Sequence, residues 1–222
     1  MKILIVYAHP EPKSMNGAMF NTAIATLQAE GHEVKTSDLY AMAFNPVSDR
    51  YNFTSVLNAD FYKQQLEEQH ASRVHGFAAD IAAEQEKLDW CDLMIWQFPL
   101  WWFGIPAILK GWVDRVFAMG TSYGNGQFYD TGVYTGKKAM LSLTIGGQKN
   151  DYLKTGSHGD MDNMLKPIHR GILQFTGFSV LEPQFVYGPA RQTAAERAGA
   201  LEEWVARLKQ IHEETTIDIT NY

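Results

Sequence analysis

The chain of 222 residues carries 25 acidic and 19 basic side chains, and its net charge of −6 argues against sequence-independent nucleic-acid binding, which needs clustered Lys and Arg. Apolar residues make up 45% and charged residues 20%, a globular rather than a disordered composition, and the length fits a single domain over residues 1–222. Cys91 is the lone cysteine, which excludes an internal disulfide and a multi-cysteine metal cage and fits a reducing compartment.

The N-terminal segment predicts a strand–helix–strand unit. Residues 3–8 form a continuous apolar run, typical of a parallel strand that is buried on both faces. The run is too short to span a membrane and no cleavage site for a secretion signal follows it, so we expect a cytoplasmic protein without membrane insertion. A polar loop at residues 9–16, a helix at 17–29 and a strand at 33–37 complete the unit.

The same alternation continues to the end of the chain. Helices are expected at residues 78–89, 106–117, 161–175 and 193–213, and strands at residues 93–96, 139–144 and 178–181, the last with room to continue to residue 186. Pro167 should kink the third of these helices or move its start, and Thr193 with Glu196 matches a capping box. The alternation predicts an α/β fold with a doubly wound, five-stranded parallel sheet in the flavodoxin-like order 2-1-3-4-5.

Residues 40–76 interrupt this rhythm after the second strand. The segment carries several aromatic residues in a polar background and shows no helical or strand periodicity. A long irregular insertion of this kind is more often a lid or a subunit contact than a linker.

Several catalytic motifs can be set aside. No Walker-type loop occurs, and the first strand is not followed by GxGxxG. Ser122 lies in a GxSxG pattern, but a nucleophile elbow needs a strand before the serine and a helix after it. The run from His158 through Asp160 to Asp162 offers three metal-ligand types, but the two carboxylates fit the start of a helix better, so we expect no metal.

Ligands of such sheets bind at the carboxyl ends of the strands, where the strand order reverses. In the predicted order three loops meet there, at residues 9–17, 98–104 and 145–158. These loops are also the segments richest in reactive and aromatic side chains. Topology and composition therefore indicate one functional site, with Tyr152 and His158 at its rim.

The residues of these loops suit a flavin. Ser14 and Asn16, with the backbone N–H groups of the first helix turn, can bind phosphate; the alternative is that they serve only as helix caps. Trp101, Trp102 and Phe103 are three consecutive aromatics at the end of the central strand, more than core packing explains. The glycines after Thr144 would let the backbone approach a flat ring closely.

Four longer motifs resemble one family. The runs QFPLWWFGIPAILKGWVDRVF from Gln97, SDLYAMAFNP from Ser37, GSHGDM from Gly156 and GFSVLEPQ from Gly177 are similar to the NAD(P)H:quinone oxidoreductases of the DT-diaphorase type. These proteins are flavodoxin-fold flavoenzymes, and the similarity extends from the first strand to the closing helix.

The resemblance implies a role for each site residue. Tyr152 and His158 would be the catalytic pair, and Arg197 would lie near the distal adenosine, which favours FAD over FMN. The remaining flavin ligands would be His9, Ser14, Met15, Asn16, Gly17, Pro99, Leu100, Trp101, Trp102, Phe103, Thr144, Gly146, Gly147 and Tyr152. The quinone pocket would be shaped by Tyr123, Asn125, Phe128 and the segment 175–178 including Phe178, partly across the interface of a homodimer.

The activity that the resemblance implies is two-electron reduction of quinones by NAD(P)H through ping-pong hydride transfer. Asn125 stands where members of the family often have a second tyrosine, and Met15 where an aromatic residue is common. Two alternatives stay open: an FMN-binding azoreductase or nitroreductase, and a flavodoxin-like regulatory subunit of a membrane transporter.

Overall fold

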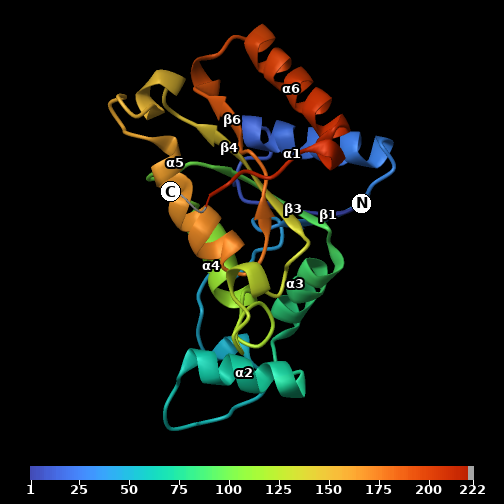
Figure 1. The fold of residues 1–222 in the computed structure, drawn as a ribbon, viewed down its shortest axis with the longest axis vertical. Helices are drawn as coiled ribbons and strands as arrows, with labels where there is room; N and C mark the ends of the chain where they lie inside the picture. The colour runs from blue at the N-terminus through green and yellow to red at the C-terminus, as the bar shows by residue number, and fades with distance from the viewer. Residues whose placement is uncertain (220–222) are drawn as a thin grey trace.

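A parallel sheet runs through the centre of the computed structural model, which describes residues 1–219 (Figure 1). Its strands are β1 (Lys2–Tyr7), β2 (Glu33–Asp38), β3 (Leu93–Pro99), β4 (Lys138–Ile145), β5 (Ser179–Val180) and β6 (Gln184–Tyr187). The order β2-β1-β3-β4-β5 confirms the flavodoxin-like arrangement, and all the strand pairs are parallel.

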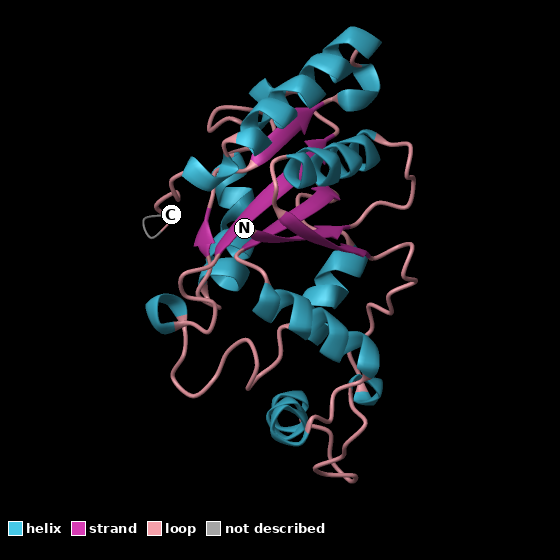
Figure 2. Ribbon diagram, turned by 90° about the vertical axis from the view of Figure 1, so that its right-hand side faces the viewer, coloured by secondary structure: helices cyan, strands magenta, loops and turns pink. Residues whose placement is uncertain are grey.

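Helices cover both faces of the sheet (Figure 2). Alternate residues of β1 face opposite sides, so Ile3 and Ile5 pack under α1 (Met15–Ala29) and α6 (Ala194–Lys209). Leu4 and Val6 face the other layer. That layer consists of α3 (Ala79–Trp90), α4 (Ala107–Val116) and α5 (Met161–Ile168). Burial on both faces explains why the strands read as continuous apolar runs.

The predicted fifth strand is divided in two. β5 and β6 both pair with β4, at Lys138–Ala139 and at Ser142–Ile145, and Pro183 lies between them. Proline has no N–H to donate, so it interrupts a hydrogen-bonded ladder at this point. The sheet therefore has six strands in place of the expected five.

The helix predicted for residues 161–175 changes its hydrogen-bonding pattern midway. It starts at Met161 and is α-helical to Ile168, and residues His169–Gln174 then form a π-helix. The interruption expected from Pro167 thus takes the form of a wider turn two residues later, not of a new start or a break. The closing helix α6 does begin at the Thr193–Glu196 capping box, but it ends at Lys209, ahead of a short 3₁₀ turn at Ile211–Glu213.

The insertion at residues 40–76 is not irregular throughout, because α2 (Gln64–Val74) lies within it. Sequence periodicity misses this helix since its buried side chains are Glu67, Glu68 and Ala71, so it has no apolar stripe. Buried carboxylates need partners, and each has them: Glu67 accepts the N–H groups of Leu57 and Asn58, and Glu68 accepts that of Met119. Polar contacts therefore fix this part of the insertion.

The structure supports setting the other motifs aside. Ser122 is fully buried and hydrogen-bonded to the Tyr134 hydroxyl at 2.8 Å, and Asp160 caps α5 by accepting the N–H of Asp162. Burial raises the pKa of Cys91 to about 11, so its thiol is inert. Residues 1–219 contain no cluster of three metal-ligating side chains. None of the helices formed by these residues is both long and apolar enough to cross a bilayer.

Candidate functional site

The first loop forms one end of the site at the start of α1. Ser14 caps this helix by accepting the N–H of Gly17 at 3.1 Å, so the capping interpretation holds for its hydroxyl. Asn16 is not a cap: its side chain bonds to Gln97 and Thr144. A Cβ on Gly17 would lie 2.0 Å from the carbonyl oxygen of Pro12, so only glycine fits here.

A cavity of about 440 Å³ opens above this helix terminus. Three cationic or titratable side chains line it, His9 and Lys13 from the first loop and Arg197 from α6. The other lining residues are Ser14, Met15, Asn16, Thr144, Pro189 and Ala190. The positive end of the helix dipole and these side chains make the cavity suitable for an anion such as a phosphate.

The second loop is a tight turn at the end of β3. Trp101 and Gly104 exchange backbone hydrogen bonds, and between them Trp102 and Phe103 have φ angles of 52° and 58°. Left-handed backbone at both central residues is typical of a type I′ turn, which usually carries Asn and Gly. Trp102 is 97% exposed, so no packing within the described residues offsets the energetic cost of this backbone conformation. Leu100 ties the turn to β4, because its N–H donates to the Thr144 carbonyl at 2.8 Å.

The third loop brings Tyr152 and His158 to the same place. The ring centroids of Tyr152 and His158 lie 5.1 Å apart, and that of Phe103 lies 6.4 Å from Tyr152 and 5.6 Å from His158. Tyr152 is buried and His158 exposed. A Cβ on Gly147 would come within 2.6 Å of the Tyr152 ring, so the glycine allows this close approach. Because the centroids of His9 and Trp101 lie 6.1 Å apart, the three loops meet as the topology predicts.

The residues expected to shape a substrate pocket lie elsewhere. Tyr123 and Phe128 pack against Phe175 with centroid distances of 5.8 and 5.2 Å, and within residues 1–219 neither ring packs against Tyr152 or His158. Asn125 lies in the same exposed loop. Phe178 differs from expectation: it is 1% exposed and packs in the core against the tilted ring of Tyr134, so Phe175 rather than Phe178 presents a ring surface.

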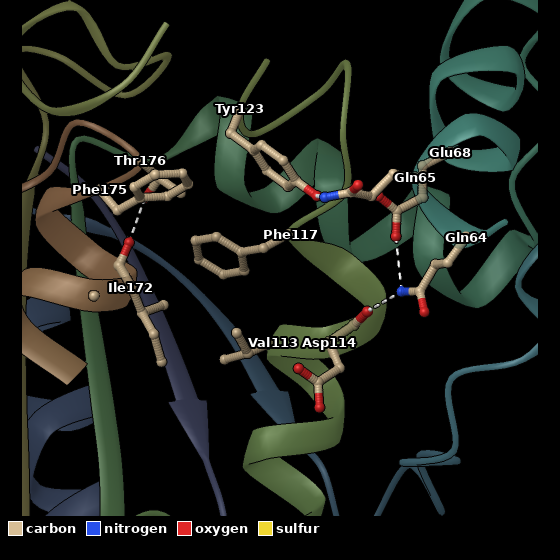
Figure 3. A pocket seen from close by; sticks show the side chains of 11 residues that line it. Gln64, Gln65, Glu68, Val113, Asp114, Phe117, Tyr123, Ile172, Phe175 and Thr176 are labelled. Carbon is tan, nitrogen blue, oxygen red and sulfur yellow. Dashed lines mark hydrogen bonds between the residues drawn. The ribbon is translucent and has the colours of Figure 1, made fainter. Parts of the chain in front are cut away.

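A pocket of about 350 Å³ adjoins the cluster of Tyr123, Phe128 and Phe175 (Figure 3). Phe117, Phe175 and Tyr123 point into it from the ends of α4 and of the π-helix and from the loop, as the close-up shows. The opposite wall comes from α2, where the Gln64 amide donates to Glu68 at 2.8 Å. Burial raises the pKa of Glu68, and hydrogen bonds from Met119, Gln64 and Tyr123 oppose the rise.

Gln97 lies beneath the cavity at the start of α1, but the sequence pattern alone does not single it out. It is 1% exposed and hydrogen-bonds to Asn16. The available signal is its polarity, since glutamine stands in the otherwise apolar run LMIWQFP of β3. A buried polar residue within such a strand needs a partner and indicates a specific task.

Strain at the aromatic turn leads to a testable expectation. Replacing Trp102 by Asn, which visits the left-handed region readily, should raise the free energy of unfolding by about 1 kcal/mol, measured in urea without added ligand. Trp101→Asn is the matched control, because the φ of Trp101 is not positive and no gain is expected. Equal stability of the Trp102 variant and the wild type would show that this turn is not strained.

Comparisons with known proteins agree with this geometry. The family model described as "Flavodoxin-like fold" matches residues 1–208. The chain is 44% identical to human ribosyldihydronicotinamide dehydrogenase [quinone], over 99% of this chain and 95% of that protein. It is also 44% identical to rat NAD(P)H dehydrogenase [quinone] 1, over 97% and 79%. A Klebsiella pneumoniae structure assigned as a quinone reductase superposes with a TM-score of 0.94 at 42% identity, over 98% and 87%.

Proposed function

The chain belongs to the flavodoxin-like NAD(P)H:quinone dehydrogenase family, and from this premise we propose that it is an FAD enzyme that reduces quinones by two electrons. NAD(P)H would be the donor, and the two substrates would react in turn at one pocket, in ping-pong order. The observation that carries the proposal is the meeting of the aromatic turn with Tyr152 and His158, beside a cavity with cationic walls.

The residues present fit a flavin. The cavity at the start of α1 offers His9, Lys13 and Arg197 to phosphates, together with the free N–H groups of the first helix turn. The ring system would lie at the turn of Trp101, Trp102 and Phe103, whose exposed aromatic surface has no use in the protomer alone. The other proposed ligands include Met15 and Thr144, which line the cavity, and Gly17, Pro99, Leu100, Gly146 and Gly147.

The chemistry that a bound flavin supplies is transfer of a hydride from NAD(P)H to the quinone in two half-reactions. The chain's own contribution is orientation, exclusion of water and the handling of charge. The Tyr152 hydroxyl can donate a hydrogen bond to negative charge that develops at the turn. The exposed His158 imidazole can exchange protons between solvent and this place, since its two ring nitrogens can donate and accept a proton.

A homodimer completes the proposed quinone pocket. In one protomer the cluster of Tyr123, Phe128 and Phe175 lies apart from Tyr152 and His158. If this cluster covers the aromatic turn of a second copy, both exposed aromatic surfaces are buried at once. Light scattering should then show a dimer at micromolar concentration. A monomer with full quinone reductase activity would remove the shared pocket from the proposal.

The cofactor is tested by releasing it. We expect denatured protein to yield FAD by chromatography, and Arg197→Met to weaken FAD binding about tenfold while leaving FMN affinity unchanged, because Arg197, which lines the cavity, would face the second phosphate and the adenosine of FAD, which FMN lacks. Release of FMN instead would favour the FMN alternative. Absence of any flavin after reconstitution would overturn the enzymatic proposal and favour a regulatory role.

A further inference from the structure

A buried chain of three side chains lies directly under the cavity at the start of α1. The Gln97 amide nitrogen donates to Asn16 Oδ1 at 2.7 Å, and the Asn16 amide nitrogen donates to Thr144 Oγ1 at 2.6 Å. The three residues come from β3, α1 and β4 and are 1%, 2% and 7% exposed. Asn16 and Thr144 line the cavity, whereas Gln97 does not.

These two hydrogen bonds run in one donor-to-acceptor direction, and Gln97 sets that direction. Its amide nitrogen also faces the Met19 sulfur at 3.8 Å, a weak acceptor, so both neighbours of this nitrogen accept. Because Asn16 Oδ1 is held by Gln97, the amide nitrogen of Asn16 must face Thr144. The Thr144 oxygen then accepts this bond, and its own hydrogen is left to donate elsewhere.

This direction matters to what the cavity can bind. With Gln97 as donor, the Thr144 hydroxyl is left to donate at the cavity wall, which Lys13 and Arg197 also line. An oxygen-rich anionic ligand requires such a set. With the chain reversed, Asn16 Oδ1 would face Thr144, and the hydroxyl would be consumed inside the protein.

We propose that Gln97 is a positioning residue for the cofactor: through Asn16 it fixes the donor direction of Thr144 and thereby sets the affinity for the phosphate and ribityl part of the flavin. This inference rests on the proposed function. Gln97 acts without touching the ligand, because Asn16 lies between them.

Substitution of Gln97 by the near-isosteric glutamate tests the direction. An ionised carboxylate only accepts, so Asn16 must turn and Thr144 must donate inward. We expect Gln97→Glu to bind FAD and FMN at least tenfold more weakly than the wild type at pH 7.5, by titration calorimetry of the apoprotein. On lowering the pH to 5.5 the affinity should recover to within about threefold of the wild type, because a protonated carboxyl in this buried place again donates to Asn16.

Two further variants distinguish an effect of the hydrogen-bond direction from an effect of added charge and from a general effect of core packing. Gln97→Met removes the donor without adding charge, and we expect a three- to tenfold loss at both pH values. Ser142→Ala is the control: Ser142 is the register partner of Gln97 in β4 and fully buried, and its hydroxyl has no hydrogen-bond partner among residues 1–219, so its loss should change affinity less than twofold. Urea unfolding of each apoprotein checks that the fold is intact.

The flavin affinities of the two Gln97 variants decide whether Gln97 is a positioning residue. Wild-type affinity in Gln97→Met together with a large loss in Gln97→Glu would mean that charge alone acts, and it would overturn the positioning role. Wild-type affinity in both variants would overturn it as well. Failure of the wild-type apoprotein to bind either flavin would instead count against the proposed function.

Discussion

Replacing Tyr152 by phenylalanine is expected to slow the half-reaction with NAD(P)H by about 10–100-fold, or about 1.4–2.7 kcal/mol, while the flavin stays bound. The substitution keeps the buried ring, which lies beside Phe103 and against Gly147, and removes only the hydroxyl. Under the proposed function, hydride transfer to a bound flavin would bring negative charge close to this hydroxyl. We expect a similar slowing in His158→Gln, because the exposed imidazole lies 5.1 Å from the Tyr152 ring and acts on the same charge.

Stopped-flow absorbance of the bound cofactor measures this half-reaction directly. The double variant should lose less than the product of the two single losses, since both residues serve one charge. Tyr187→Phe is a matched control: its ring lies 6.0 Å from Tyr152, but it belongs to β6 and is outside the proposed machinery, so its rate should equal that of the wild type. Wild-type rates in both single variants, with flavin fully bound, would show that Tyr152 and His158 are structural.

The sheet order was predictable because a parallel strand buried on both faces has an unmistakable pattern. β1 and β3 show continuous apolar runs, and strand–helix alternation then allows few topologies. The switch point followed from the order, and with it the three loops that meet at the site. Composition could not predict the strained turn at Trp102 and Phe103, because the usual sequence signal of a type I′ turn is Asn and Gly.

Two of the differences, at α2 and at Gln97, have one cause, which is structure held by polar contacts rather than by an apolar face. α2 buries Glu67 and Glu68, and periodicity therefore gives no helix there. Gln97 lies in an apolar run, and its partner Asn16 is 81 residues away in the sequence, so the chain to Thr144 is visible only in three dimensions. Phe178 could not be separated from Phe175 by sequence, since the two rings point to the core and to the surface from one short segment.

Arg115 joins the insertion to the helices through buried polar contacts of the same kind. Its guanidinium is 3% exposed and donates to Asn52 Oδ1, to the Asn45 carbonyl and to Asp80, at 2.8–2.9 Å. It also lies over the Phe44 ring, 5.0 Å from the centroid. One side chain on α4 thus joins both ends of the 44–52 segment to α3, which is a planar, multidentate task that suits arginine.

We expect Arg115→Met to lower the free energy of unfolding by about 2–4 kcal/mol, measured by urea denaturation of the apoprotein. Asp80 is 43% exposed and can be hydrated, so the loss comes mainly from Asn52, which is 1% exposed and keeps an unsatisfied oxygen, and from the Asn45 carbonyl. Limited proteolysis should cut the insertion faster in the variant, because its anchor on α4 is gone.

Lys110→Met is the matched control for Arg115→Met. Lys110 lies on the same helix and forms an ion pair with Asp114, but both side chains are about half exposed, at 52% and 43%. Solvent-exposed pairs of this kind typically contribute about 0.3–0.5 kcal/mol, so the control should unfold almost as the wild type does. Equal stabilities for the two variants would mean that burial does not distinguish these cations, and that the insertion is held by its apolar contacts and by Glu67 instead.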